Sequence, residues 1–563
     1  MRLEVDGYST VTELVGRAVR TDLSMVPAPH DALSVVAAPG DPADVRTLVL
    51  RIPGAEVGGL VEYRYQRLYR DPDFVPVWLL GGPLPVVRAE LGIVARDGIR
   101  VDYRYGRGND LVDRLPLRRR LGDGSERLVF VETNLAAYYP EPDMPHPARL
   151  APWIALTMTR AKVGDSPRKL ETWDDVSGRT RSLFAAVGGE PLAGSAPERF
   201  ALVRDALKGI RRDGAGVRPP STAKKLIGGE AACSRDAAAY LLTALAKSGA
   251  KAYPALLTAH SGPPAVEGFP GFYPFVRVVV ALDVRDEVAK DPSCRADPGR
   301  RGLLCTVPQD SYAFLDPLCS GCRFGELPTE LTGGRALVLL DQGPRWVDVP
   351  ADPPERNRVM VQMQLSLGVD GKLTGELNGE TTGGPARRLR QSLTQSERGE
   401  ARDEALQAQL FGDPAAVHLR RGTYANPTRI DKPLSFRSQA EGAADKRGYE
   451  HYEVSAVGLA GASFPGRWRS HRRWPLVLSA PLWSEVAVAV ELPVGYQVTP
   501  PPITRIVEPF AEYAAGYARR ERTLSYSRRL IVKKQVISAA DYPAFRRFIE
   551  EVSAVEAAPL AVR

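Results

Sequence analysis

The residues of this chain best suited to chemistry lie around one cysteine, Cys233. It follows a glycine-containing turn and precedes a run of strong helix formers from Ala237 to Lys247. A cysteine in the first turn of a helix lies at the positive end of the helix dipole, which lowers the thiol pKa and favours the nucleophilic thiolate. A small buried cysteine at a helix start would give the same pattern. Cys233 is therefore either a nucleophile for acyl transfer or a core residue.

Two strand-like stretches follow the helix and carry the other polar candidates. Residues 275–282 include Arg277, and residues 312–317 include Asp316. Cysteine acyl transfer requires a proton acceptor and a group that orients it. Asp316 could orient, but Arg277 stays protonated and has no lone pair with which to accept a proton. His260 is the single histidine between residues 166 and 350, so it is the remaining candidate base.

The order of these elements resembles the core of the transglutaminase-like superfamily, a papain-related fold. In that core a nucleophilic Cys starts a helix, and a His and an Asp follow on two strands. The resemblance rests on Leu226 and Cys233, on the Ala/Leu-rich helix that ends at Gly249, and on the strands 275–282 and 312–317. It implies a thiol enzyme fold in which the helix packs on an antiparallel sheet and these two strands are adjacent.

The resemblance also assigns the site residues. It implies that Cys233, Arg277 and Asp316 occupy the triad positions, with Arg277 where the family has His. An ion pair between Arg277 and Asp316 is expected there, because the planar guanidinium can engage both carboxylate oxygens. When the family pattern is counted forward from Leu226, the nucleophile position falls on Cys233. Counted back from the end of the helix, it is Ser234, because this helix is one residue longer than usual. Both registers stay open.

The stretch before this core predicts a β-rich unit. Residues 60–66 alternate apolar and polar side chains, which is typical of a half-buried strand. The turn at Arg96-Asp97-Gly98 predicts a hairpin between residues 91–95 and 99–105. Short alternating strands favour an antiparallel sandwich. The region also resembles the uncharacterised β domain that precedes the core in bacterial transglutaminase-like proteins.

The stretch after the core returns to alternation, as at residues 360–367, with one helix expected over residues 383–410 and another over 540–552. It resembles the C-terminal domain of the same bacterial proteins. The expected fold class is therefore α+β multidomain. Its three domains are a β-sandwich (1–165), a transglutaminase-like (papain-like) α+β core (166–350) and a β-rich C-terminal domain with a terminal helix (351–563).

Four of the five cysteines gather late in the middle stretch, at positions 294, 305, 319 and 322. They could form two disulfides or one zinc site. The first spacing is long for a zinc knuckle and no histidine lies among them, so disulfides are favoured. A zinc-stabilised structural module is the third interpretation of the chain. No cofactor and no metal is expected.

Charge and hydropathy restrict the partners and the location. The net charge of +8 is spread over the chain, with basic clusters at residues 118–120 and 467–474. The second cluster mixes arginine with tryptophan, as a nucleic-acid surface does, but no nucleic-acid module surrounds it, so no nucleic acid is expected. No run of about 20 apolar residues predicts a transmembrane span. Residues 1–7 do not form a signal peptide. The family resemblance still implies an extracytoplasmic protein, periplasmic or secreted, with a cytoplasmic location as the alternative.

Two functions are compatible with these residues. The first is a pseudoenzyme with a degenerate Cys/His/Asp site, which binds a peptide or protein partner as a scaffold of the cell envelope. The second is an active cysteine peptidase or amide acyltransferase that uses Cys233 and Asp316 with an unrecognised base. The first is favoured, because Arg277 cannot return a proton to a leaving amine near neutral pH.

Overall fold

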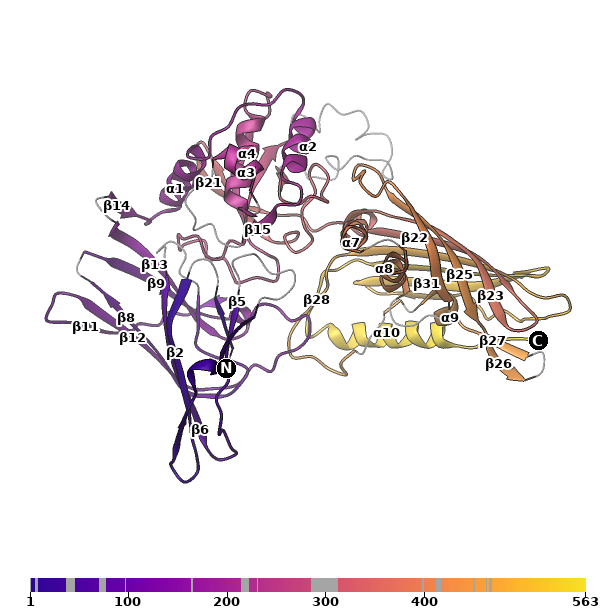
Figure 1. Ribbon diagram of the computed structural model, residues 1–563, viewed down its shortest axis with the longest axis horizontal. Helices are drawn as coiled ribbons and strands as arrows, with labels where there is room; N and C mark the ends of the chain where they lie inside the picture. Colours follow the sequence, from indigo (N-terminus) through magenta and orange to yellow (C-terminus); the bar gives the residue numbers. More distant parts are fainter. Residues whose placement is uncertain are drawn as a thin grey trace.

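The structure is a computed structural model in which three groups of elements follow one another along the chain (Figure 1). The N-terminal sheets and the C-terminal sheet lie at opposite ends, and the helices of the middle part lie above and between them. The structure describes residues 2–5, 9–36, 46–69, 77–96, 98–163, 166–213, 222–229, 231–284, 312–396, 399–411, 417–448, 451–461, 463–464 and 468–563.

The N-terminal part is built from strands. They are β1 (Arg2–Val5), β2 (Ser9–Val19), β3 (Met25–Pro27), β4 (Leu33–Val36), β5 (Arg46–Leu50), β6 (Leu60–Tyr69), β7 (Trp78–Leu79), β8 (Val86–Ala95), β9 (Arg100–Arg107), β10 (Asp110–Leu111), β11 (Leu117–Arg120), β12 (Glu126–Leu135), β13 (Pro152–Val163) and β14 (Ser166–Lys169). The sheets β11-β12-β8 and β10-β9-β13-β14 face each other. Leu128 and Phe130 of β12 pack there against Tyr105 and Ile154, so apolar contact between two sheets holds this part together.

The hairpin expected at residues 96–98 is wrong. A turn does form, since the Ile99 amide donates to the Arg96 carbonyl at 3.0 Å and Gly98 has a φ of +81°. However, β8 pairs with β12 and β9 pairs with β13, so the two strands belong to different sheets. The turn carries the chain from one sheet to the opposite one, because both strands have apolar side chains in the shared core.

The middle part combines strands with short helices. They are α1 (Trp173–Ala185), α2 (Ala196–Ala206), β15 (Arg211–Asp213), α3 (Ala223–Ile227), β16 (Ala231–Cys233), α4 (Ser234–Leu245), β17 (Ala252–Leu257), β18 (Arg277–Asp283), β19 (Tyr312–Leu315), β20 (Arg335–Leu340) and β21 (Gly343–Asp348). An antiparallel sheet runs in the order β19-β18-β17-β20-β21. The apolar face of α4, with Ala237 and Leu241, packs on Val280, Leu282 and Leu315 of this sheet. The expected adjacency of the strands around Val278 and Phe314 is confirmed.

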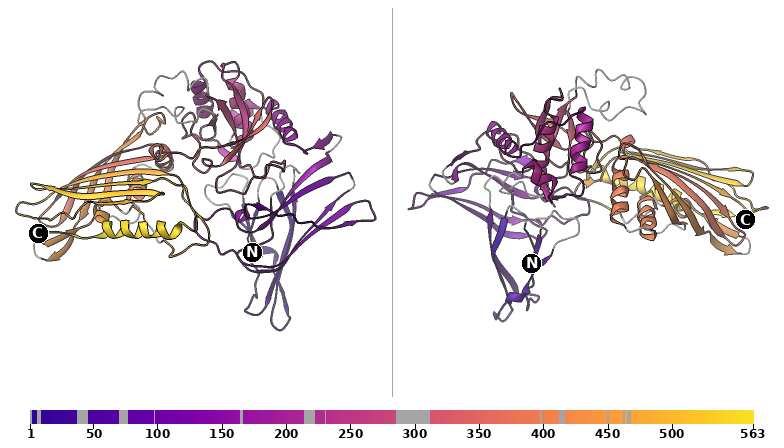
Figure 2. Two further views of the ribbon diagram at one scale, coloured as in Figure 1. Left: turned by 180° about the vertical axis from the view of Figure 1, so that it is seen from behind. Right: turned by 45° about the horizontal axis from the view of Figure 1, so that its top comes forward.

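The C-terminal part is organised by one large sheet. Its elements are β22 (Arg358–Leu367), β23 (Lys372–Thr381), α7 (Gly383–Gln395), α8 (Glu400–Phe411), β24 (Val417–Ala425), β25 (Leu434–Ala443), β26 (Asp445–Gly448), β27 (His451–Val454), α9 (Ala456–Ala460), β28 (Leu476–Val477), β29 (Leu482–Glu491), β30 (Thr504–Val507), β31 (Ala511–Arg520), β32 (Thr523–Val532), β33 (Val536–Ile537), α10 (Tyr542–Ala557) and β34 (Leu560–Val562). Eight strands follow the order β24-β25-β23-β22-β29-β32-β31-β30. The helix α10 lies along one face of the sheet (Figure 2), where Phe545 and Phe548 join its core.

The expected α+β fold class is wrong. Strands account for most of the regular structure, and within the described ranges they form nine separate sheets. The longest described helix, α10, has 16 residues. The middle part contributes four short helices beside its sheets, and these do not make a clear papain-like α+β core. The expectation gave too much weight to the helix after Cys233. The division into domains at residues 165 and 350 stays a prediction.

The basic and aromatic cluster at residues 467–474 makes an internal contact. Glu141 of the N-terminal part lies 3.4 Å from Arg472 Nε and accepts hydrogen bonds from the backbone amides of Arg473 and Trp474. The Trp474 indole donates to the Tyr139 carbonyl at 3.2 Å. Arg472 and Trp474 therefore join the C-terminal part to the N-terminal part, while Arg467 lies outside the described residues.

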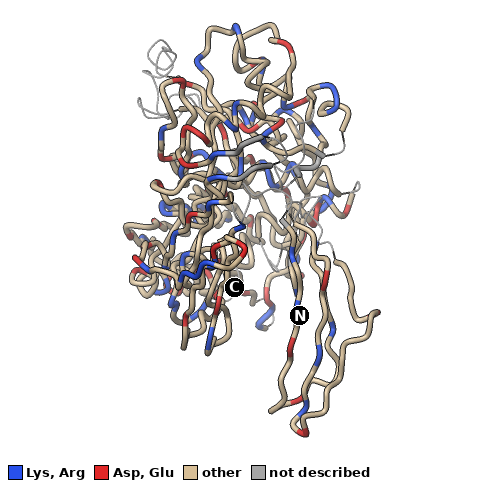
Figure 3. Tube along the Cα trace, turned by 90° about the vertical axis from the view of Figure 1, so that its left-hand side faces the viewer, with Lys and Arg blue, Asp and Glu red and all other residues tan. Residues whose placement is uncertain are grey.

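Lys and Arg are interspersed with Asp and Glu over the described part of the trace (Figure 3). This interspersion agrees with a positive charge that is spread over the chain. None of the described helices has both the length and the apolar character needed to cross a bilayer.

Candidate functional site

Cys233 lies where the short strand β16 meets α4. It is the N-cap residue of α4, with extended backbone angles, and its side chain is buried. The helix forms here because alanine and leucine follow the cap, and their apolar face docks on the middle sheet. The sequence therefore placed Cys233 correctly at a helix start, but it did not show how deeply the thiol is enclosed.

The thiol of Cys233 is not activated. Its pKa is raised to about 12, mainly by burial and to a smaller extent by the nearby Asp236 carboxylate, while Arg235 acts in the opposite direction. The expectation of a lowered thiol pKa is wrong, because the loss of hydration outweighs the favourable charge of Arg235. At neutral pH Cys233 is a protonated thiol with the properties of a small apolar residue.

Ser234, the alternative nucleophile, occupies a different position. Its side chain is only partly buried, and its Oγ accepts a hydrogen bond from the backbone amide of Val278 at 3.1 Å. Val278 directly follows Arg277 in β18, so Ser234 faces the strand that carries the second site residue. Of the two candidate nucleophiles, Ser234 is therefore the one that contacts the backbone of β18.

Arg277 and Asp316 meet inside the protein as a buried ion pair. Arg277 Nη1 contacts Asp316 Oδ2, and the two side chains are 6% and 0% exposed. The other Asp316 oxygen accepts from the Leu318 amide at 3.0 Å, and Arg277 Nη2 lies 3.6 Å from Glu330. The ion pair expected from the sequence is present. It forms because β18 and β19 are neighbours in the sheet.

His260 does not act as the missing base in this arrangement. Its Nδ1 lies 3.2 Å from the Glu330 carbonyl oxygen and 3.4 Å from Gln535 Nε2. Burial lowers its pKa, so the ring is neutral. Among the described residues it makes no hydrogen bond to Cys233, Ser234 or Asp316. It joins the middle part to the segment before α10.

Two of the four clustered cysteines form a disulfide. Cys319 and Cys322 are bonded, with Cα atoms 5.3 Å apart, and both are buried. The Cys319 amide donates to the Asp316 carbonyl at 3.1 Å, so the bonded loop begins at the site aspartate. Cys294 and Cys305 lie outside the described residues. The described part holds no group of three or more possible metal ligands.

The sequence analysis missed three residues at the site. Glu330 reaches Arg277 from the segment before β20. Arg235 and Asp236 form a buried pair at 2.8 Å beside Cys233. The adjacent charges in Arg235-Asp236, followed by an apolar helix, could have indicated a buried pair, because unpaired charges are rarely tolerated there.

The comparisons with known proteins agree with this architecture. Residues 461–562 match DUF3858, a domain family of unknown function with a solved structure. A crystal structure described as a putative protease from Parabacteroides distasonis ATCC 8503 matches at a TM-score of 0.59 with 12% identity. The match covers 100% of this chain and 91% of that one. No curated protein matches the sequence. The chain is thus similar in fold, over its whole length, to that putative protease.

Proposed function

We propose that this chain is a transglutaminase-like protein whose thiol site no longer catalyses acyl transfer and instead binds a peptide or protein partner. The observation that carries the proposal is the buried pair of Arg277 with Asp316. An active site of this type needs a neutral base beside the nucleophile, and a guanidinium cannot take that role.

The state of Cys233 supports the same proposal. Its pKa of about 12 leaves almost no thiolate at neutral pH, and its side chain is 5% exposed. Ser234 is more accessible. Among the described residues, its hydroxyl has a hydrogen bond from the backbone amide of Val278 in β18, and an amide N–H cannot accept the hydroxyl proton. Neither candidate nucleophile therefore has both exposure and an activating base within the described residues.

Two exposed polar groups beside the buried pair support a peptide or protein as the partner. The Glu330 side chain is 56% exposed and Ser234 is partly exposed, so a carboxylate and a hydroxyl remain available for hydrogen bonding. The Cys319–Cys322 disulfide supports a location in an oxidising compartment, such as the periplasm or the cell exterior.

A designed thiol tests whether the missing base explains the loss of chemistry. In the variant Ser234→Cys the new thiol faces β18. Adding Arg277→His supplies an imidazole that Asp316 can orient. We expect the double variant to be alkylated by iodoacetamide at pH 7 at least about tenfold faster at position 234 than Ser234→Cys alone, because a neighbouring His lowers a thiol pKa.

The matched control is Ser234→Cys with Arg277→Gln, which removes the guanidinium without adding a base. It should show no comparable gain. Equal alkylation rates in Ser234→Cys and in the two double variants would show that a base at position 277 does not reach position 234. That result would contradict the proposal. Turnover of peptide substrates by the unmodified protein, abolished by Cys233→Ala, would establish the peptidase alternative instead.

A further inference from the structure

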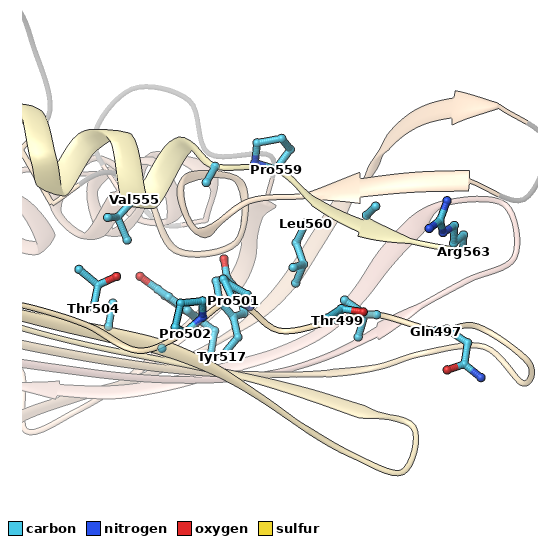
Figure 4. A pocket seen from close by; sticks show the side chains of 16 residues that line it. Gln497, Thr499, Pro501, Pro502, Thr504, Tyr517, Val555, Pro559, Leu560 and Arg563 are labelled. Carbon is cyan, nitrogen blue, oxygen red and sulfur yellow. The ribbon is translucent and has the colours of Figure 1, made fainter.

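A cavity of about 560 Å³ lies in the C-terminal part, far along the chain from Cys233. It lies between the sheet strands β31 and β32, the end of α10 with β34, and the loop at residues 497–504, and it is partly open to solvent (Figure 4). We infer that this cavity is a binding site for a neutral, largely apolar small molecule that carries a hydrogen-bond acceptor. The inference does not depend on the proposed function.

The size and walls of the cavity suit such a molecule. Its volume falls within the range of about 300–1,000 Å³ that is usual for small-molecule sites. Val555 and Leu560 cover it from the side of α10, and Pro501 and Pro502 close it from the loop (Figure 4). Ala515 stands on the inner face of β31, where a larger side chain would fill the space.

Two tyrosines supply the polar groups. The hydroxyl of Tyr517 is buried and has no hydrogen-bond partner among the described residues. The Tyr526 hydroxyl is also buried, and it lies beside the Tyr513 hydroxyl and the Arg528 side chain. Tyr526 is 2% exposed, and the Tyr517 side chain rises from the sheet toward the segment after α10 (Figure 4). The Tyr526 ring packs against the Tyr517 ring, with centroids 4.8 Å apart, and holds it in place. A ligand oxygen that accepts from the Tyr517 hydroxyl would supply the partner that this buried donor lacks.

The hydroxyls act as donors toward the ligand. Burial raises the pKa of both Tyr517 and Tyr526, so both remain protonated at every physiological pH. A carbonyl or ether oxygen has lone pairs for them and needs no proton of its own. The chemistry of these two rings therefore selects an acceptor.

The surrounding charges favour a neutral ligand. Arg563 is the single charged residue among those that line the cavity. Behind the tyrosines, Glu556 is 3.1 Å from Arg528, and both side chains are buried, so their charges compensate each other. A charged ligand would lose its hydration without gaining a buried counter-ion.

Benzophenone and diphenylmethane form a suitable pair of probes, because they differ in one carbonyl group. The full-length protein is labelled on Val and Leu methyl groups, and binding is followed by NMR at Val555 and Leu560. We expect both compounds to shift these resonances, with benzophenone binding about tenfold more tightly. In the variant Tyr517→Phe/Tyr526→Phe both should still bind, but the preference for benzophenone should disappear.

Three controls define the result. Tyr424→Phe removes a hydroxyl that donates to the Arg402 carbonyl outside the cavity, and it should keep the preference. Ala515→Leu should abolish binding of both probes. The anion 4-benzoylbenzoate should bind more weakly than benzophenone. Unchanged Val555 and Leu560 resonances, equal affinities in the unmodified protein, or a preference that survives loss of both hydroxyls would overturn the inference. Tighter binding of the anion would overturn the neutral class.

Discussion

Asp316→Ala is expected to lower the free energy of unfolding of the middle sheet by about 3–5 kcal/mol, because it leaves a buried guanidinium without its counter-charge. Asp316 is fully buried and Arg277 is 6% exposed, so water does not replace the lost carboxylate. The variant also removes the acceptor of the Leu318 amide. Glu330, at 3.6 Å, compensates part of the charge, which places the effect toward the lower end of the range.

Native-state hydrogen exchange at increasing urea concentrations, followed on peptides of β18, measures this loss locally. The matched control is Asp341→Ala, which breaks a pair with Arg181 in which Asp341 is 76% exposed, and it should change almost nothing. The variant Arg277→Met/Asp316→Leu removes both charges and should regain most of the stability. An Asp316→Ala protein as stable as the control would show that this pair is hydrated.

Glu556→Ala is expected to destabilise the C-terminal sheet by a similar amount, about 3–5 kcal/mol. Glu556 is 1% exposed and lies on α10, where it is 3.1 Å from Arg528 of β32. It also accepts a hydrogen bond from the Ser463 amide at 2.8 Å. Removing the carboxylate therefore leaves both a buried charge and a buried amide without a partner.

Exchange protection of β32 peptides, compared between variants, measures the effect of Glu556→Ala. Glu550→Ala on the same helix is the control, since its pair with Arg546 is 54% exposed on the glutamate side. It should cost only a few tenths of a kcal/mol. Equal losses in the two variants would mean that the effect comes from the helix rather than from the buried pair.

Local elements could be read from the sequence wherever periodicity was clear. The alternating stretch at residues 360–367 is the strand β22, which is longer by two residues. The helix expected over residues 540–552 is α10, shifted toward the C-terminus. The single helix expected over residues 383–410 is wrong, because α7 and α8 are separated around Gly399, whose φ of +84° no helix continues through.

Strand pairing in the N-terminal part was not predicted from the sequence. The pattern at residues 91–105 contained both strands and the turn, but only packing decides that they join opposite sheets. The α+β expectation failed for the same reason, since the number of sheets depends on which strands meet.

At the site, residue types predicted contacts better than they predicted energetics. An arginine and an aspartate on consecutive strands were expected to pair, and they do. The pKa of Cys233 is raised, whereas the sequence predicted a lowered pKa. The difference arises because the burial of the thiol depends on the packing of α4 on β18. The contact of Ser234 with Val278 depends on the same packing.

The rate of Cys233 alkylation by iodoacetamide tests the central claim most directly. Mass spectrometry follows the tryptic peptide 226–235, in the folded protein and in urea. With a pKa of about 12 rather than 9.0, the folded thiol holds about 10³-fold less thiolate at pH 7.5. We therefore expect alkylation at least 100-fold slower in the folded protein, with a rate still rising at pH 10. Faster alkylation in the folded protein than in urea would show an activated nucleophile and contradict the account.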